Sequence, residues 1–383
     1  MHRIVISGYY GFGNLGDEAI LATLVQQLKD RYELVVLSAD PASTEAEFGV
    51  RAIGRTDMGA IWQALGGASL FLSGGGGLMQ DVTGSLSVPY YAGLMKLAQW
   101  RRVPTMVFGQ GVGPLKNRSS RLMVRAAFGR AQALTVRDQA SYDLVRSLGV
   151  SADRVVLAAD PVLCLKPADS ERIDAIAQSI GLSPDLPKIA VAVRPWYTWF
   201  ERQFKVFNTA LTQLSMEAGA QLVLLPFQMP GDERITEELY DCLRYRPEGH
   251  VAPVAMLQAP LTAPEMEGLI GRMDMVIGMR LHALIMAASS GVPSVGLVYD
   301  PKVAHLCNQW GFPSVPSIEA LDDANSFERM LSNAWKERAA TKERLQRVGD
   351  EWRAKARKNF ETIDRLLGKD RPSKAVEPSE TGV

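Results

Sequence analysis

The stretch "MDMVIGMRLHALIMAASSGVPSVGL", residues 273–297, decides the fold because it contains one complete repeat of a parallel sheet. A short apolar run ends at Gly278, an apolar helix follows, and Gly-Val-Pro leads into a second apolar run. Continuous apolar strands joined through helices are typical of parallel sheets that are covered on both faces. Arg280 and His282 stand at the turn between strand and helix, where ligands bind in such sheets.

Similar apolar runs recur along the whole chain, with longer helical patterns between them. They begin with "RIVISG" (3–8) and end, in the first half, with "RVVLAAD" (154–160). A second series starts at "KIAVAVRP" (188–195). We therefore predict an α/β fold of two doubly wound Rossmann-like domains that face each other across a cleft, the layout of GT-B-type glycosyltransferases.

The composition of the chain places the domain boundary at residues 166–187, where prolines and polar residues flank one short helix. We expect residues 1–165 to form an N-terminal domain on the acceptor side and residues 188–322 a C-terminal domain on the donor side. The helical spacing of apolar residues over 323–367 predicts charged helices with one buried face. The composition of residues 368–383 is typical of a disordered tail.

One face of the predicted C-terminal helices is basic and carries Lys355, Arg357 and Lys358. Such a face is most often simply solvated. The alternative is a contact with an anionic membrane surface.

The overall composition excludes several classes of function. The 383 residues are 47% hydrophobic, and Lys and Arg balance Asp and Glu at 42 each, so no global field attracts nucleic acid. The N-terminus lacks the layout of a signal peptide, and no run approaches the roughly 18 apolar residues of a membrane span, which predicts a cytoplasmic protein. Three widely spaced cysteines predict reduced buried thiols, and four histidines without ligand spacing predict no metal and no cofactor.

The first loop, "SGYYGFGNLGDEAIL" (7–21), has four glycines between a strand and a helix. Glycine-rich turns that enter helices commonly bind phosphate, but Asp17 and Glu18 at this helix start would repel an anion. The loop is either a tight turn with acidic residues that cap the helix start or a polar ligand-binding surface of the cleft. In the second case Asn14 and Asp17 face the cleft and suit sugar hydroxyls.

Two further strand-end loops are candidates for ligand contacts. "FLSGGGGLMQD" (71–81) includes Gly74, Gly75 and Gly76, which permit the close approach of a ligand. "GQGVGPLKNRSSR" (109–121) contains cations, of which Lys116 and Arg118 could hold a diphosphate. A solvated basic turn is the alternative for this second loop.

Cations also follow several of the predicted strands. Arg137 and Asp138 in "TVRDQAS" favour a structural ion pair. Arg194, in contrast, precedes the aromatic residues Trp196, Tyr197 and Trp199, which favours an anion or sugar platform. Arg280 offers a guanidinium fork for phosphate or carboxylate, His282 a proton donor, and Lys302 a further cation on the next strand's end.

Taken together and in order, these motifs resemble the polysaccharide pyruvyltransferases, most closely the CsaB type. The resemblance spans roughly residues 3–320 and depends on seven segments. They are "GYYGFGNLGDEAIL", "SGGGGLMQD", "GQGVGP", "VRDQAS", "DPVL", "MRLHALIMAASSGVP" and "YDPKVAHL".

The resemblance implies transfer of the enolpyruvyl unit of phosphoenolpyruvate to a sugar, with loss of phosphate. For the CsaB type it implies a 4,6-pyruvate ketal on N-acetylmannosamine in a lipid-diphosphate-linked wall-polymer precursor that anchors S-layer proteins. The protein would then lie in the cytoplasm, peripheral at the inner face of the cell membrane.

The candidate residues fit such a reaction. Arg194, Arg280 and Lys302 would bind phosphoenolpyruvate, His282 would act as the acid and Asp17 as the base. Arg280 would lower the pKa of His282 by repulsion, and the bound donor would raise it. Two other functions share the predicted fold, namely a glycosyltransferase that uses a nucleotide sugar and a non-catalytic protein that binds sugars or anions.

Overall fold

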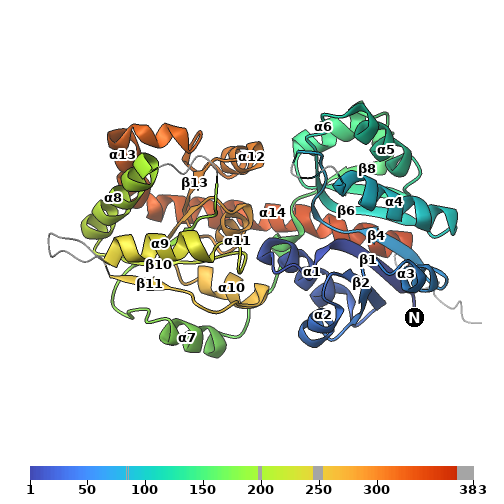
Figure 1. The fold of residues 1–383 in the computed structure, drawn as a ribbon, viewed down its shortest axis with the longest axis horizontal. Helices are drawn as coiled ribbons and strands as arrows, with labels where there is room; N and C mark the ends of the chain where they lie inside the picture. The colour runs from blue at the N-terminus through green and yellow to red at the C-terminus, as the bar shows by residue number, and fades with distance from the viewer. Residues whose placement is uncertain (83, 85, 197–200, 245–252, 369–383) are drawn as a thin grey trace, which may run out of the picture.

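The computed structural model describes residues 1–82, 84, 86–196, 201–244 and 253–368, which fold into two α/β lobes side by side (Figure 1). Two predictions fall outside these residues. They concern the aromatic side chains of Tyr197 and Trp199 and, except for Gly368, the disordered tail 368–383.

The first lobe is built on an eight-stranded sheet of the described residues, with the strand order β3-β2-β1-β4-β6-β7-β8 and β5 paired with β6. All of its strand pairs are parallel. The strands are β1 (Arg3–Tyr10), β2 (Glu33–Ser38), β3 (Arg51–Gly54), β4 (Leu70–Ser73), β5 (Gly76–Met79), β6 (Thr105–Val112), β7 (Ala133–Val136) and β8 (Val155–Leu157). The order reverses between β1 and β4, so the loops after these two strands flank the crevice where such sheets bind ligands.

The second lobe repeats this plan with a six-stranded sheet of order β11-β10-β9-β12-β13-β14. Its pairs are also parallel. The strands are β9 (Lys188–Ala192), β10 (Gln221–Leu224), β11 (Val254–Met256), β12 (Met275–Gly278), β13 (Ser294–Leu297) and β14 (Ser314–Val315). Here the order reverses between β9 and β12, which places the loops that carry Arg194 and Arg280 next to each other.

Helices cover both faces of each sheet, as the continuous apolar strands predict. On the first sheet, α3 (Met58–Leu65), α4 (Ser87–Trp100), α5 (Arg118–Phe128) and α6 (Gln139–Ser147) cover the outer face, and α1 (Leu15–Leu28) and α2 (Pro41–Phe48) the inner one. On the second, α8 (Glu201–Ala218), α9 (Glu233–Arg244) and α13 (Ala324–Lys336) cover the outer face, and α10 (Ala263–Ile270), α11 (Leu281–Ser289) and α12 (Pro301–Trp310) the inner one. Short 3₁₀ helices are η1 (Ala152–Arg154), η2 (Pro161–Cys164) and η3 (Glu319–Asp322).

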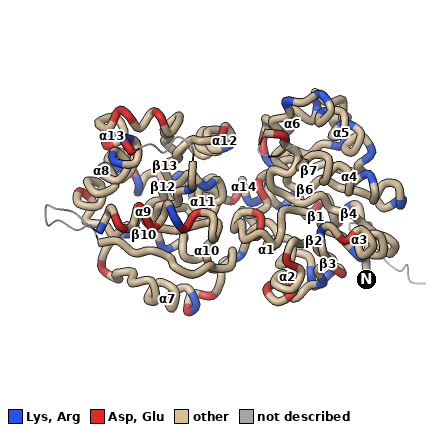
Figure 2. Tube along the Cα trace, viewed as in Figure 1, with Lys and Arg blue, Asp and Glu red and all other residues tan. Residues whose placement is uncertain are grey.

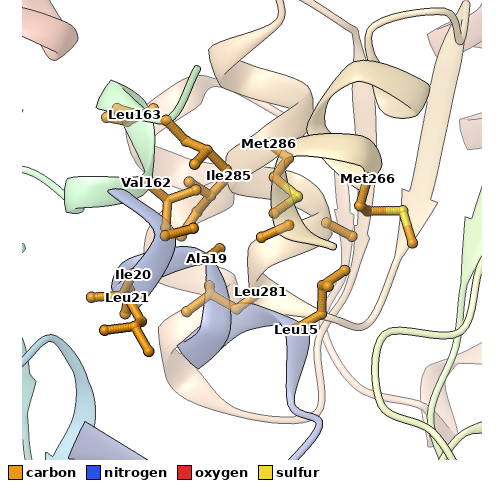
Figure 3. Packing of buried hydrophobic residues seen from close by; sticks show 14 of the residues in the cluster. Leu15, Ala19, Ile20, Leu21, Val162, Leu163, Met266, Leu281, Ile285 and Met286 are labelled. Carbon is orange, nitrogen blue, oxygen red and sulfur yellow. The ribbon is translucent and has the colours of Figure 1, made fainter. Parts of the chain in front are cut away.

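The inner faces of the two lobes share one apolar core. Side chains of α1, η2, α10 and α11 interdigitate where the lobes meet (Figure 3). The linker helix α7 (Ser170–Ser179) packs against α10 of the second lobe (Figure 1). A continuous core fixes the two sheets relative to each other, so loops from both lobes can build one site.

The last helix, α14 (Arg338–Leu366), crosses from one lobe to the other (Figure 1). In the second lobe Arg353 Nη1 donates to the carbonyl oxygen of Ser289 at 3.1 Å. In the first lobe Asn359 Nδ2 donates to the carbonyl oxygen of Ala159 at 2.9 Å, and Arg31 pairs with Asp364 at 2.7 Å. One of the predicted charged helices, α14, therefore contacts both lobes and connects them.

None of the described helices has the length and apolar content needed to cross a membrane. The described His, Cys, Asp and Glu residues form no group of three or more that could hold a metal ion. All three cysteines are free, but the prediction that they are buried is wrong for Cys242, which is exposed.

Candidate active site

A small cavity of about 130 Å³ lies between the carboxyl edges of the two sheets. Its walls come from the start of α1, the first residues of β5, and the segments that follow β7, β9, β10, β12 and β13. The residues that line it are Asn14, Gly16, Asp17, Gly76, Gly77, Arg137, Arg194, Phe227, Arg280, Leu281, His282, Tyr299 and Lys302. Two parallel sheets that meet edge to edge thus bring together most of the residues singled out in the sequence.

Asp17 is the buried acid of this cavity, with 8% of its surface exposed. Asn14 Nδ2 donates a hydrogen bond to its Oδ2. Burial raises the pKa of the Asp17 carboxyl to about 7, although the positive charges of Arg137 and Lys302 act in the opposite direction. A carboxyl group with a pKa near neutrality can both accept and donate a proton at working pH.

His282 stands in the first turn of α11, and 14% of its side chain is exposed. Its Nε2 lies 3.9 Å from Asp160 Oδ2, and a Cβ at Gly16 would overlap the other side of the ring. Burial lowers the pKa of the imidazole to about 4, and the nearby carboxylate of Asp160 opposes this shift. The ring is therefore neutral in the ligand-free site, and burial rather than repulsion by Arg280 is the main cause.

Arg280 is less available to a ligand than the sequence predicts. Its Nε donates to Asp232 Oδ2 at 2.8 Å, and its Nη2 to Asp232 Oδ1 and to Gln228 Oε1. Asp232, which is fully buried, also accepts from the backbone N–H groups of Phe227 and Gln228. The guanidinium fork is thus already occupied by a carboxylate.

The loop held by Asp232 connects the two lobes at the cavity. Leu15 donates its backbone N–H to the carbonyl oxygen of Phe227 at 3.0 Å, and Asn14 forms an isolated β-bridge with Gln228. Arg280 therefore positions the start of α1, and with it Asp17, relative to the start of α11.

Three other cations line the cavity. Arg137 forms the predicted ion pair, but its close partner is Asp160 at 2.8 Å, whereas Asp138 lies at 3.7 Å. Lys302 Nζ lies 3.4 Å from Asp300 Oδ2. Arg194 donates to the hydroxyl of Tyr299 at 3.2 Å, and its guanidinium stacks on that ring and on Trp196.

The glycine loop contributes one of its three predicted residues to the cavity. Gly76 has φ +89°, and a Cβ at this position would meet Asp17 Oδ1 at 2.5 Å. Gly74 and Gly75 instead allow the backbone to approach Tyr10 and Ile20 in the core. Their role in this structure is therefore packing behind the cavity.

Lys116 and Arg118 lie outside the cavity lining. Both are exposed, and the backbone N–H of Lys116 donates to Asp81 Oδ1 at 2.8 Å. The structure thus favours the solvated basic turn over a diphosphate site at these residues.

Sequence reasoning assigned no site role to Arg137, Asp160 or Asp232. The segment "DPVL" begins with Asp160, three residues after the end of β8, and the other site residues also lie near strand ends. No comparable signal marks Asp232, because it lies inside a polar loop and its partner is 48 residues away.

Comparison with known proteins places the chain in a family. Residues 14–301 match the sequence model of the polysaccharide pyruvyl transferase family, which is well over half of the chain. The chain belongs to that family. The amylovoran biosynthesis protein AmsJ of Erwinia amylovora is 20% identical over 273 residues, or 67% of this chain, and the match spans 63% of AmsJ.

Solved structures share the fold of this pyruvyl transferase family member at low sequence identity. A putative UDP-N-acetylglucosamine 2-epimerase from Listeria monocytogenes has a TM-score of 0.67 at 12% identity and covers 96% of this chain and 97% of its own. Anabaena HepE, solved with UDP, has a TM-score of 0.61 at 15% identity and covers 96% of this chain and 100% of its own. These similarities confirm the predicted GT-B-like fold.

The protein has a second and larger cavity of about 900 Å³ that shares Asp17, Gly77 and Lys302 with the first. Apart from Lys302, its lining comes from the N-terminal lobe and includes three aromatic side chains, Tyr9, Tyr90 and Tyr91, for which we call it the aromatic cavity. The guanidinium of Arg55 lies 4.4 Å above the ring of Tyr90. Aromatic faces with a cation between them suit a sugar ring with polar substituents.

The Arg280–Asp232 pair supports a prediction about the stability of this protein. Asp232→Asn should lower the free energy of unfolding by about 3–5 kcal/mol, because it leaves the charge of Arg280 buried without its carboxylate. Urea denaturation measures the change. Glu238→Gln, which breaks the exposed pair with Arg234, is the control and should cost less than about 0.5 kcal/mol. Equal effects of the two substitutions would contradict a structural role for Asp232.

Proposed function

We propose that this protein transfers the enolpyruvyl unit of phosphoenolpyruvate to a lipid-diphosphate-linked glycan precursor that contains N-acetylmannosamine. The product is a 4,6-pyruvate ketal, and phosphate is released. One observation carries the proposal. Cations from both lobes surround a small cavity that also contains a buried carboxyl group and a buried imidazole.

The donor fits the small cavity by charge and by size. Phosphoenolpyruvate carries a phosphate and a carboxylate, and Arg194 and Lys302 present positive charge from two different strand ends. A cavity of about 130 Å³ is small beside the roughly 300–1,000 Å³ of sites for drug-sized ligands. It therefore suits a compact anion better than a nucleotide sugar.

The acceptor fits the aromatic cavity, which opens onto the same reacting centre. A sugar that stacks on Tyr9 or Tyr90 would present its hydroxyl groups toward Asp17, because Asp17 lines both cavities. The acceptor therefore occupies the N-terminal lobe, as the sequence predicts, but through aromatic residues in place of Lys116 and Arg118.

The reaction needs one proton on carbon and two deprotonated hydroxyl groups. His282, made cationic by the bound donor, protonates the methylene carbon, and the first sugar hydroxyl attacks the resulting cationic centre as Asp17 takes its proton. Phosphate leaves, and the second hydroxyl closes the ring. Of the two hydroxyl protons, one restores the acid and the other leaves with phosphate.

One experiment tests the proposal. The purified protein is incubated with phosphoenolpyruvate and a synthetic disaccharide-diphosphate-lipid, and the acceptor is analysed by mass spectrometry. A gain of one pyruvyl ketal together with released phosphate is the expected result. Modification with a UDP-sugar but none with phosphoenolpyruvate would identify a glycosyltransferase instead.

The placement of the donor leads to a prediction about binding. Arg194→Ala and Lys302→Met should each weaken phosphoenolpyruvate binding by about 10- to 100-fold, since a charged hydrogen bond contributes roughly 1.5–3 kcal/mol. Titration calorimetry measures the affinity. Arg118→Ala removes an exposed cation outside the cavity and is the matched control, with no expected change. Unchanged affinity in both cavity variants would place the donor elsewhere.

A further inference from the structure

The charge of the chain is distributed very unevenly. The whole sequence is neutral, yet residues 82–137 contain nine Lys and Arg and no Asp or Glu. The rest of the chain has 33 basic residues against 42 acidic ones. A block of this kind creates a local positive field that the net charge conceals.

This segment forms α4, β6 and α5 and the loops between them. Arg137 points into the candidate active site, whereas Arg102, Arg118, Arg125 and Arg130 are exposed around the two helices. Figure 2 shows Lys and Arg gathered around α4 and α5 on the outer side of the first lobe. Within the described residues, Arg137 is the one cation of this segment that forms an ion pair. No carboxylate that the structure describes neutralises the others.

Large apolar side chains stand among these cations. Trp100, at the end of α4, is 72% exposed, and Leu122 and Met123 on α5 are 64% and 41% exposed. Gln99 Nε2 donates to the carbonyl oxygen of Ala127 at 2.8 Å, which holds the carboxyl ends of the two helices together. Basic residues interspersed with Trp, Leu and Met are typical of surfaces that insert into the headgroup region of a membrane.

The basic face of α14 differs in this respect. Its Lys355 pairs with Glu351 at 2.7 Å, and Arg353 pairs with Asp350 at 3.0 Å. Glu351 and Asp350 therefore neutralise one of the three cations of that face, Lys355, and the neighbouring Arg353. This pairing favours the solvated face among the two interpretations of the sequence.

We propose that the surface formed by α5 and the carboxyl end of α4, here called the α4–α5 surface, docks on anionic phospholipid. Its unpaired cations attract the headgroups, and Trp100, Leu122 and Met123 enter the interface. The same helix α4 lines the aromatic cavity through Ser87, Pro89 and Tyr90 at its other end. Docking would allow a lipid-linked acceptor to enter that cavity from the membrane. This part of the inference rests on the proposed function.

Sedimentation with vesicles tests the surface independently of catalysis. Wild-type protein should bind vesicles of phosphatidylcholine mixed with phosphatidylglycerol, and not phosphatidylcholine alone, with affinity that falls as salt increases. Each cation near such a surface strengthens binding by about fivefold. The triple variant Arg102→Glu, Arg125→Glu, Arg130→Glu should therefore bind at least about 100-fold more weakly. Trp100→Ser with Leu122→Ser should also bind more weakly, at every salt concentration.

The matched control is the α14 triple variant Lys355→Glu, Arg357→Glu, Lys358→Glu. Its affinity for the vesicles should stay within about twofold of wild type. Thermal unfolding confirms that each variant is folded. Equal vesicle binding by the α4–α5 triple variant and wild type would overturn the inference, as would loss of binding in the α14 control. Tighter binding of wild type to duplex DNA than to the anionic vesicles would also overturn it.

The activity assay separates this inference from the proposed function. On a lipid-free disaccharide acceptor, the α4–α5 variants should turn over at the wild-type rate. Absence of turnover by every protein, wild type included, on both this acceptor and the lipid-linked one would refute the proposed function and leave the vesicle result standing.

Discussion

His282→Gln is expected to lower the rate of pyruvyl transfer by about two to four orders of magnitude while changing the affinity for phosphoenolpyruvate little. This is the usual contribution of a general acid. Glutamine keeps much of the volume and polarity of the imidazole, so the cavity and its cations should stay in place. Donor affinity by calorimetry and turnover by phosphate release separate the two effects.

The protonation of His282 should depend on the donor. In the ligand-free site burial holds the pKa of the imidazole at about 4, so the ring is neutral. The phosphate and carboxylate of the donor would raise this pKa, because opposite charges favour the protonated form. The imidazole nitrogen signals in NMR should therefore change from neutral to cationic when phosphoenolpyruvate is added at neutral pH.

A nearby histidine provides the control for this substitution. His305 lies on α12, is exposed and is not part of the cavity lining, so His305→Gln should turn over at the wild-type rate. A His282→Gln variant that binds donor and turns over normally would remove His282 from catalysis.

Asp17→Asn is expected to cause a loss of similar size, about two to four orders of magnitude in kcat/KM. Asparagine has nearly the same shape but cannot accept the hydroxyl proton. In the wild type the carboxyl group has a pKa of about 7 and acts as a base only when ionised. The value of kcat/KM should therefore rise as the pH increases through about 7, and this rise should be absent in the variant.

Glu18→Gln is a stringent control for that result. Glu18 is the next residue on α1, and burial raises its pKa to about 7 as well. Its Oε1 accepts the backbone N–H of Gly11, and it lines a different cavity, beside α2. Less than about a tenfold loss is expected. A larger loss of kcat/KM in Glu18→Gln than in Asp17→Asn would show that Asp17 is not the base.

The sequence alone determined the two sheets and the positions of most site residues. Apolar runs that alternate with helical patterns specify parallel strands, and parallel strands place all their carboxyl ends at one edge. For this reason Asp17, Arg194, His282 and Lys302, each near a strand end in the sequence, could be predicted to meet. The strands and their ends follow from the local periodicity of apolar residues, which can be read without knowing which residues are in contact in the folded chain.

The tertiary structure alone decided what those residues can do. Arg280 was predicted to bind a ligand, but a carboxylate from a loop 48 residues earlier in the chain occupies it. Asp17 and Glu18 are adjacent in the sequence and face different cavities. The neutral state of His282 and the raised pKa of Asp17 both come from burial where the two lobes meet. Charge state and pairing depend on the dielectric surroundings and on partners that only the packed chain brings within a few ångströms, whereas periodicity depends on neighbours along the chain.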